Sequence, residues 1–251
     1  MPNFESSRKK IERANKHIAD LNTLWSEFAN RDFYSLRIEQ DADLMNWLVL
    51  EFDPEEFPRV HAAIIIGDTL HNLRSALDIL WHEVIAYCGG EPTKYTRFLI
   101  RDTREELIAP MNGALKEQQI TRDVHDFIFD SVKPYKAGNY CLWAVDDLNV
   151  RDKHQLIIPV TQLSAIADVC FEDDQGASFP FDYWLLADES WRIRLKEFYG
   201  RKLTVKDKGH ATGNILFDIP PFEGQAVIPS LNSLSIAVLG TLESFANLMP
   251  G

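Results

Sequence analysis

The stretch that decides the fold is residues 58–90, PRVHAAIIIGDTLHNLRSALDILWHEVIAYCGG. Apolar residues recur along it at helical spacing, and one helical face collects Ile66, Leu70, Leu73, Leu77, Leu80 and Val84. Gly89 and Gly90 follow this pattern and are typical of a helix C-terminus. The stretch therefore predicts a long helix from Pro58 to Cys88 that buries its apolar face in a core.

The opposite face of this helix carries a polar stripe, with Arg74 at its edge. The stripe consists of Asp68, His71, Ser75, Asp78 and His82. Solvated helix faces are usually built from Lys, Glu and Gln, and none of these occurs between Asp68 and His82. Short polar side chains suit fixed hydrogen bonds instead. A solvated face, a buried structural network and a functional site all remain open as interpretations.

A second polar cluster lies in residues 143–159, WAVDDLNVRDKHQLIIP. In a helix, Asp147, Arg151 and His154 share one face, and Asn149, Asp152 and Lys153 share another. His154 stands where the predicted helix gives way to a strand, a place where scaffolds often present functional side chains. A helix C-terminus stabilised by Lys153 and His154 explains the cluster equally well. We expect the two clusters to meet, with Arg74 pairing with Asp152 or Asp78 and with His71 or His154 close by.

The remaining segments alternate between helical and strand-like patterns. Further helices are predicted over residues 6–29, over 140–152 and from Ser230 onward, with Ser230 as a cap, and over 103–115 and 121–132, each capped by a Thr. Strand-like segments are 35–41, 46–53, 155–163, 167–174, 179–188, 201–207 and 213–220. Residues 191–200 fit a helix or a strand.

These elements predict an α+β fold, a helical bundle-like core with an attached antiparallel β-sheet. The closing helix must find its partners among earlier helices, because a lone terminal helix cannot bury an apolar stripe. We therefore expect a single α+β domain over residues 1–251. Within it, residues 1–154 are mainly helical, 155–228 form a strand-rich insertion, and 229–251 form the closing helix.

Charge and composition restrict the class of partner. The chain has 38 acidic and 26 basic residues and a formal net charge of −12, which disfavours binding to nucleic acid. One local basic patch, Arg201, Lys202, Lys206 and Lys208, has the character of a solvated strand edge.

The sequence also predicts a compartment. No signal peptide and no membrane-spanning stretch is expected, and three widely spaced cysteines indicate reduced thiols. A cytoplasmic protein without membrane association is predicted.

Three segments carry a family resemblance: GDTLHNLRSALD at 67–78, KPY at 133–135 and LNVRDKHQ at 148–155. They resemble a family of bacterial proteins without an established activity, which has a GD-x-x-HNLRSALDHL motif, a QPY-like turn and an L-N-x-x-DKHR motif. The resemblance extends to about Pro159, and the strand-rich remainder matches only loosely. It implies a shared fold and two motif positions, and it implies no reaction.

The RSALD stretch is also similar to the Arg-x4-His motif of HEPN-type helical proteins, many of which are metal-independent ribonucleases of toxin and phage-defence systems. In that chemistry, His and Arg handle proton transfer and phosphate charge. This chain departs at the decisive position, because Ile79 stands where the His would be. His71 or His154 would have to substitute for it.

Metal and cofactor motifs are not expected. His71 with Asp68, Asp78 and His82 offers ligands at helical spacings, but no Glu-x-x-His pair recurs on another helix. The patterns HExxH, GxSxG, GxGxxG and the P-loop are also missing from the sequence. The other histidines, His17, His61, His125 and His210, are isolated. We therefore predict no cofactor and no metal.

The sequence favours a non-catalytic helical module that binds a small molecule or a protein partner, and a homo-oligomer is compatible with it. The alternative is a HEPN-like ribonuclease or another nucleotide-acting enzyme. Candidate catalytic residues for that alternative are His71, Arg74, Asp78, Asp152 and His154. Candidate binding residues are Asp68, Asn72, Asp147, Asn149 and Lys153. A concave pocket at the cluster would favour an enzyme, and a filled, hydrogen-bonded interior would favour the binding module.

Overall fold

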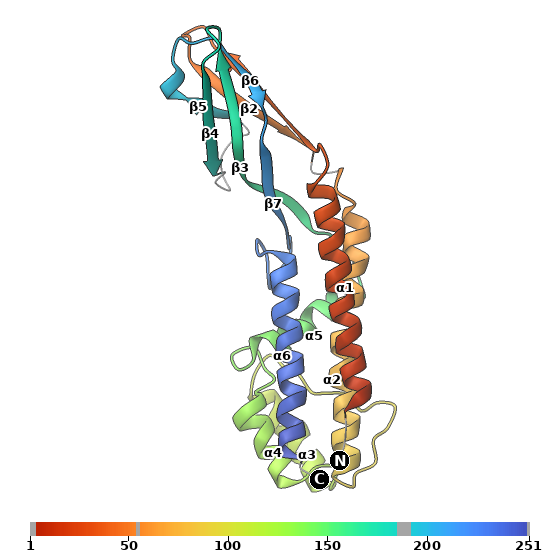
Figure 1. The fold of residues 1–251 in the computed structure, drawn as a ribbon. Coiled ribbons are helices and arrows are strands. Elements are labelled where there is room, and N and C mark those ends of the chain that lie inside the picture. The colour runs from red at the N-terminus through yellow and green to blue at the C-terminus, as the bar shows by residue number, and fades with distance from the viewer. Residues whose placement is uncertain (1–3, 54–55, 185–191, 250–251) are drawn as a thin grey trace. The chain divides into compact units, whose positions relative to one another are not determined.

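The computed structural model describes residues 4–53, 56–184 and 192–249, and it confirms the α+β fold class. Its contacts divide the chain into two compact units (Figure 1). The helical unit comprises Met1–Asn22, Val60–Ile158 and Phe217–Gly251, and the sheet unit comprises Thr23–Arg59 and Pro159–Leu216. Each unit is therefore assembled from separate stretches of chain. The single domain expected over residues 1–251 stays a prediction.

The helical unit contains most of α1 (Glu5–Ala29) together with α2 (Arg59–Tyr87), α3 (Glu105–Lys116), α4 (Arg122–Phe127), α5 (Tyr140–Asp152) and α6 (Val227–Leu248). A π-helical turn, η2 (Ile128–Val132), continues α4. Helix α1 lies beside α2 and α6 (Figure 1). Lys10 of α1 hydrogen-bonds Asn72 of α2, and Asn15 of α1 accepts a hydrogen bond from Ser235 of α6. No helix in the described residues is long and apolar enough to cross a membrane.

Helix α2 is the centre of this unit and matches its prediction within one residue at each end. All six residues of its predicted apolar face are at most 1% exposed. The C-terminal end of α2 is also as predicted. Gly89 has φ +84°, and the amides of Gly89 and Gly90 donate hydrogen bonds to the carbonyls of Ala86 and Ile85, respectively. This left-handed ending satisfies carbonyls that the last turn leaves without partners.

One of the three predicted caps, Ser230, needs correction. Thr121 does cap α4 and accepts a bond from the Val124 amide. Thr103 lies one residue before Arg104, the residue at the cap position of α3, and its hydroxyl also accepts a bond, from the Glu106 amide at 3.4 Å. Ser230 lies inside α6, where its hydroxyl donates to the Ala226 carbonyl. The helix can begin early because Pro229 sits in its first turn, where no amide donor is needed.

The sheet unit holds two antiparallel sheets. The three-stranded sheet has the order β1 (Tyr34–Gln40), β2 (Asn46–Phe52), β5 (Arg192–Leu195). The four-stranded sheet is built on β3 (Val160–Asp173), which pairs with β4 (Ser178–Trp184) on one edge and with β6 (Leu203–Asp207) and β7 (His210–Leu216) on the other. The first hairpin, which lies in the range predicted to be mainly helical, thus belongs to the same unit as the strands after residue 159.

The structure changes two strand assignments. The strands predicted at 155–163 and 167–174 are one strand, β3, whose register shifts between Ile166 and Val169, where Asp168 has φ +56°. A bulge of this kind bends a strand without ending it. Of the segment predicted at 191–200, the described residues 192–200 contain both a strand and a helical turn, since β5 is followed by a 3-10 turn, η3 (Lys196–Phe198). The end of the segment predicted at 179–188 lies outside the described residues.

Candidate functional site

Arg74 is the centre of the polar network in the helical unit. Its Nε lies 2.8 Å from Asp146 Oδ1 of α5, and its Nη2 lies 3.1 Å from Asp78 Oδ1, one turn further along α2. Nη2 also donates to the Phe98 carbonyl at 2.9 Å. The Arg74 side chain is only 11% exposed, so two carboxylates and a carbonyl enclose its charge. We call Arg74, Asp78, Asp146 and the Phe98 main chain the Arg74 network.

The network satisfies a segment that has no regular structure of its own. Asp78 Oδ1 accepts a hydrogen bond from the Phe98 amide at 2.9 Å, and Arg74 donates one to the Phe98 carbonyl. Two side chains of α2 therefore bond both main-chain polar groups of one buried residue. The Phe98 ring is 1% exposed and packs against Trp81 and Phe245. His82 Nε2 lies 3.2 Å from the Thr96 carbonyl in the same segment. Buried main-chain groups need such partners, and here the polar stripe provides them.

One guanidinium nitrogen, Arg74 Nη1, has no hydrogen-bond partner in the described part of the chain. The atom is itself buried, so a molecule in solvent cannot reach it without displacing the residues around it. Arg74 therefore offers no accessible donor to a substrate in this arrangement.

The two predicted clusters do meet, through side-chain contacts between α5 and α2. Asp146 reaches Arg74, and Asp152, near the other end of α5, lies against Gly67, two turns earlier on α2. Arg74 thus pairs with the predicted Asp78, but Asp146 takes the place that was predicted for Asp152. A signal for Asp146 was present in the sequence, since it shares a helical face with Asn149 and Lys153.

Asp152 lies at the partly exposed end of this contact. Burial raises the pKa of its carboxyl group, nearby Asp68 raises it further, and the Ile157 amide and His71 act in the opposite direction. Its Oδ1 is buried and has no partner among the residues that the structure describes. Asp68 and His71 are exposed beside it. This end of the stripe is the part of the predicted site that solvent can reach.

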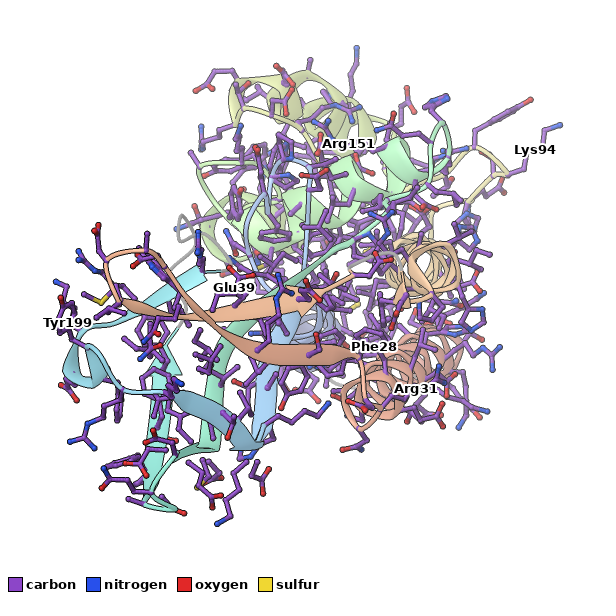
Figure 2. The ribbon with its side chains drawn as sticks, turned by 90° about the horizontal axis from the view of Figure 1, so that it is seen from above. Phe28, Arg31, Glu39, Lys94, Arg151 and Tyr199 are labelled. Atoms are coloured by element: carbon purple, nitrogen blue, oxygen red, sulfur yellow. The ribbon has the colours of Figure 1, made fainter. Side chains whose placement is uncertain are left out.

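The other predicted residues do not join the Arg74 network. Asp147 forms an i,i+4 pair with Arg151, whose place on α5 can be followed in Figure 2. Asn149 is buried, whereas Lys153 and His154 are exposed. Asn72 bonds the Asp68 carbonyl and receives a bond from Lys10 of α1. The structure thus separates the predicted set into a buried network, an exposed end and residues that contact other elements.

The chemistry that these groups can perform is limited. No group of three or more His, Cys, Asp or Glu side chains in the described residues is arranged to hold a metal ion.

Three other residues bear on the predicted chemistry. Ile79, at the position of the missing His, lines a surface hollow with Asn72 and residues of α1, among them Lys10 and Arg13. His125, expected to be an isolated histidine, lies 3.0 Å from Asn112 and 2.8 Å from Asp126. Glu83, on the same helix, has a pKa that burial raises.

Comparison with known proteins adds no relative. No family model, no curated protein and no solved structure matches this chain. The two motif resemblances stay predictions.

Proposed function

We propose that this protein is a non-catalytic binding module, in which the Arg74 network fixes the packing of the helical unit. The observation that carries the proposal is the enclosure of Arg74 by Asp78, Asp146 and the Phe98 carbonyl. An arginine that stabilises a transition state must aim its donors at the substrate. Here the engaged donors are aimed at the protein itself, and the remaining nitrogen is buried.

The energetics support the same assignment. Freeing Arg74 for a substrate would break a largely buried ion pair, a change that typically costs about 3–5 kcal/mol when one partner is lost. Such a cost would have to be recovered at every binding event. A network that stays closed avoids it and gives α2 and α5 a fixed register.

The binding surface in this proposal is the exposed end of the stripe, formed by Asp68, His71 and Asp152. Its ligand is a small molecule or a protein partner. The setting we propose is the bacterial cytoplasm, which the family resemblance supports. The free state of Cys88, Cys141 and Cys170 agrees with a reducing compartment.

The test is incubation of the purified protein with total RNA and with nucleotides, with and without a chelator. We expect no turnover of either. Cleavage that disappears in His71→Ala but persists in His61→Ala would overturn the proposal. These two histidines are both exposed on α2, so the pair separates the polar stripe from a general effect of removing an imidazole.

A further inference from the structure

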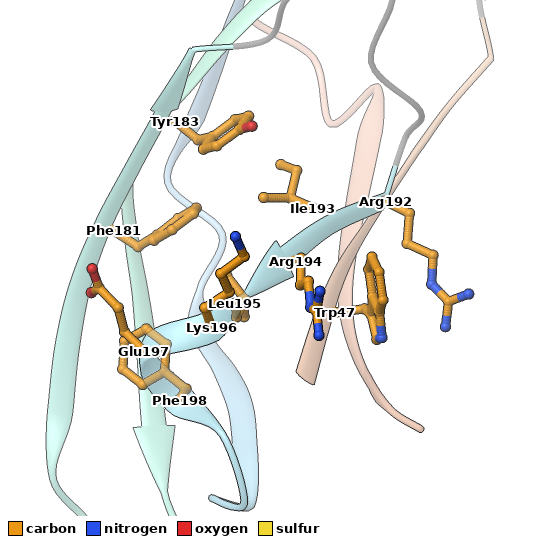
Figure 3. A pocket seen from close by; sticks show the side chains of 10 residues that line it. All are labelled: Trp47, Phe181, Tyr183, Arg192, Ile193, Arg194, Leu195, Lys196, Glu197 and Phe198. Carbon is orange, nitrogen blue, oxygen red and sulfur yellow. The ribbon is translucent and has the colours of Figure 1, made fainter. Parts of the chain in front are cut away.

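The sheet unit has a pocket of about 570 Å³, whose lining side chains are drawn in Figure 3. Ile193 faces Phe181 and Tyr183 there, whereas Arg194 lies with Trp47 on the opposite face of β5. The aromatic rings and the guanidinium group therefore do not face one ligand. A groove of the helical unit combines its apolar and charged residues differently.

This groove lies between α3 and the irregular segment 91–99, and its volume is about 490 Å³. Trp81 and Ile85 of α2 line it and are almost fully buried, so they form its floor. Pro110 and Gly113 line it from α3. A Cβ added at Gly113 would meet no atom within 4 Å, so the groove has open space beside this residue. A side chain from another molecule can therefore enter the groove without displacing the protein.

An exposed tyrosine stands at the rim of the groove. Tyr95 is 76% exposed, the largest fraction for a large hydrophobic residue in the described part of the chain. A turn fixes its main chain, because Thr93 accepts hydrogen bonds from the amides of Tyr95 and Thr96. His82 of α2 lies 3.2 Å from the Thr96 carbonyl and ties this turn to the helix. Tyrosine is one of the residues that most often dominate the affinity of protein interfaces.

Four charged side chains surround the groove and the tyrosine. Glu91, Arg97 and Glu117 line the groove, and Lys94 Nζ lies 5.0 Å from the centre of the Tyr95 ring. Figure 2 shows Lys94 at the outer side of the helical unit. All four side chains are exposed, and none forms an ion pair with another residue that the structure describes. The surface thus offers two positive and two negative charges to a partner.

We propose that this surface binds a second copy of the chain across a two-fold axis, with Tyr95 of each copy in the groove of the other. In such an interface the same patch faces itself, and each contact occurs twice. Lys94 and Arg97 of one copy then meet Glu91 and Glu117 of the other. A second copy suits these charges because both signs occur in equal number, whereas a uniformly acidic or basic partner would oppose two of them.

Sedimentation velocity on the full chain measures this association, at concentrations from about 1 μM to about 1 mM. The surface is small and the net charge of −12 repels a second copy at long range, so we expect a reversible dimer that forms as the concentration rises. A chain that stays monomeric over the whole range would overturn the proposal.

Charge reversal tests the reciprocal pairing. Lys94→Glu/Arg97→Glu makes all four charges negative, and Glu91→Lys/Glu117→Lys makes all four positive. We expect each double variant alone to dimerise at least about tenfold more weakly than the wild type. Mixed in equal amounts, the two should form a heterodimer, because opposite charges then meet at every contact. A mixture that stays monomeric, or a double variant that dimerises like the wild type, would contradict the pairing.

Two further variants assign the contact to the groove. Gly113→Leu fills the open space and Tyr95→Ala removes the inserted ring, and each should weaken the dimer by at least about tenfold. Gly240→Leu is the matched control, since Gly240 is a helical glycine of α6 that is equally open and lies outside the groove. Circular dichroism verifies that each variant is folded. Equal dimerisation by Gly113→Leu and Gly240→Leu, or unchanged dimerisation by Tyr95→Ala, would contradict the assignment. These variants leave the side chains of the Arg74 network in place, so the proposed function keeps its own test.

Discussion

Asp78 and Arg74 show what the polar stripe does at the scale of single residues: together they bond the amide and the carbonyl of Phe98. Periodicity in the sequence placed both residues on one face and predicted their pairing. It could not predict Phe98, because main-chain contacts of an irregular segment leave no pattern of residue types. The same limit explains Asp146, whose partner lies on another helix and depends on how α2 and α5 cross.

Asp152 gives the residue-scale prediction. Because burial raises its pKa, the folded carboxyl keeps a proton at pH values where the unfolded chain has lost it. Its contribution to stability is therefore present at low pH and is lost as the pH rises through the raised pKa. Asp152→Asn removes the titration. We expect the free energy of unfolding of the wild type, minus that of Asp152→Asn, to fall as the pH rises.

Urea denaturation of both proteins between about pH 3 and pH 7 measures this difference. Other groups with raised pKa values, such as Glu83, are common to both proteins and cancel in the comparison. A difference that rises with pH would mean that Asp152 is stabilised as a carboxylate in the fold.

At the scale of elements, local pattern predicted α2 and α5 closely and missed the form of β3. Helix α2 carries its apolar periodicity and its glycine stop within one stretch of chain. The predicted break between strands fell at residues 164–166, yet pairing with β4 and β7 carries one strand, β3, through this region and through the bulge at Asp168. Ser230 was misplaced for a related reason, since Pro229 was not recognised as a first-turn residue.

Gly67 gives the element-scale prediction, because it sets how closely α5 approaches α2. A Cβ at this position would lie 2.7 Å from Asp152 Oδ1, so an alanine must displace that side chain. In an exposed helix interior, Gly→Ala usually stabilises by about 0.5–1 kcal/mol. We expect Gly67→Ala to destabilise instead, by about 1 kcal/mol, as crowded substitutions do.

Gly240 is the matched control, a helical glycine of α6 with nothing within 4 Å of an added Cβ. Gly240→Ala should stabilise the protein. In an Asp152→Ala background, the cost of Gly67→Ala should disappear, and chemical denaturation of the four proteins of this cycle measures that coupling. Equal stabilisation by Gly67→Ala and Gly240→Ala would show that Asp152 does not restrict the contact.

At the scale of the whole molecule, the chain forms two compact units that interleave in sequence. Each has its own core, for example Leu70 and Leu77 in the helical unit and Leu48 and Phe171 in the sheet unit. The sequence predicted a helical core and an antiparallel sheet. It did not predict that the hairpin of β1 and β2 joins the later strands, because pairing between distant segments is not encoded in the period of either one.

The central claim is that the Arg74 network holds the helical unit together. The most direct measurement is chemical denaturation of Arg74→Ala and Arg151→Ala, followed by far-ultraviolet circular dichroism, which reports on the helices. Arg151 is the control, since its pair with Asp147 is 41% exposed on the arginine side. We expect Arg74→Ala to lower the free energy of unfolding by about 2–4 kcal/mol, because it leaves Asp78 and Asp146 unpaired, and Arg151→Ala by less than about 1 kcal/mol. An Arg74→Ala protein as stable as the wild type would contradict the account.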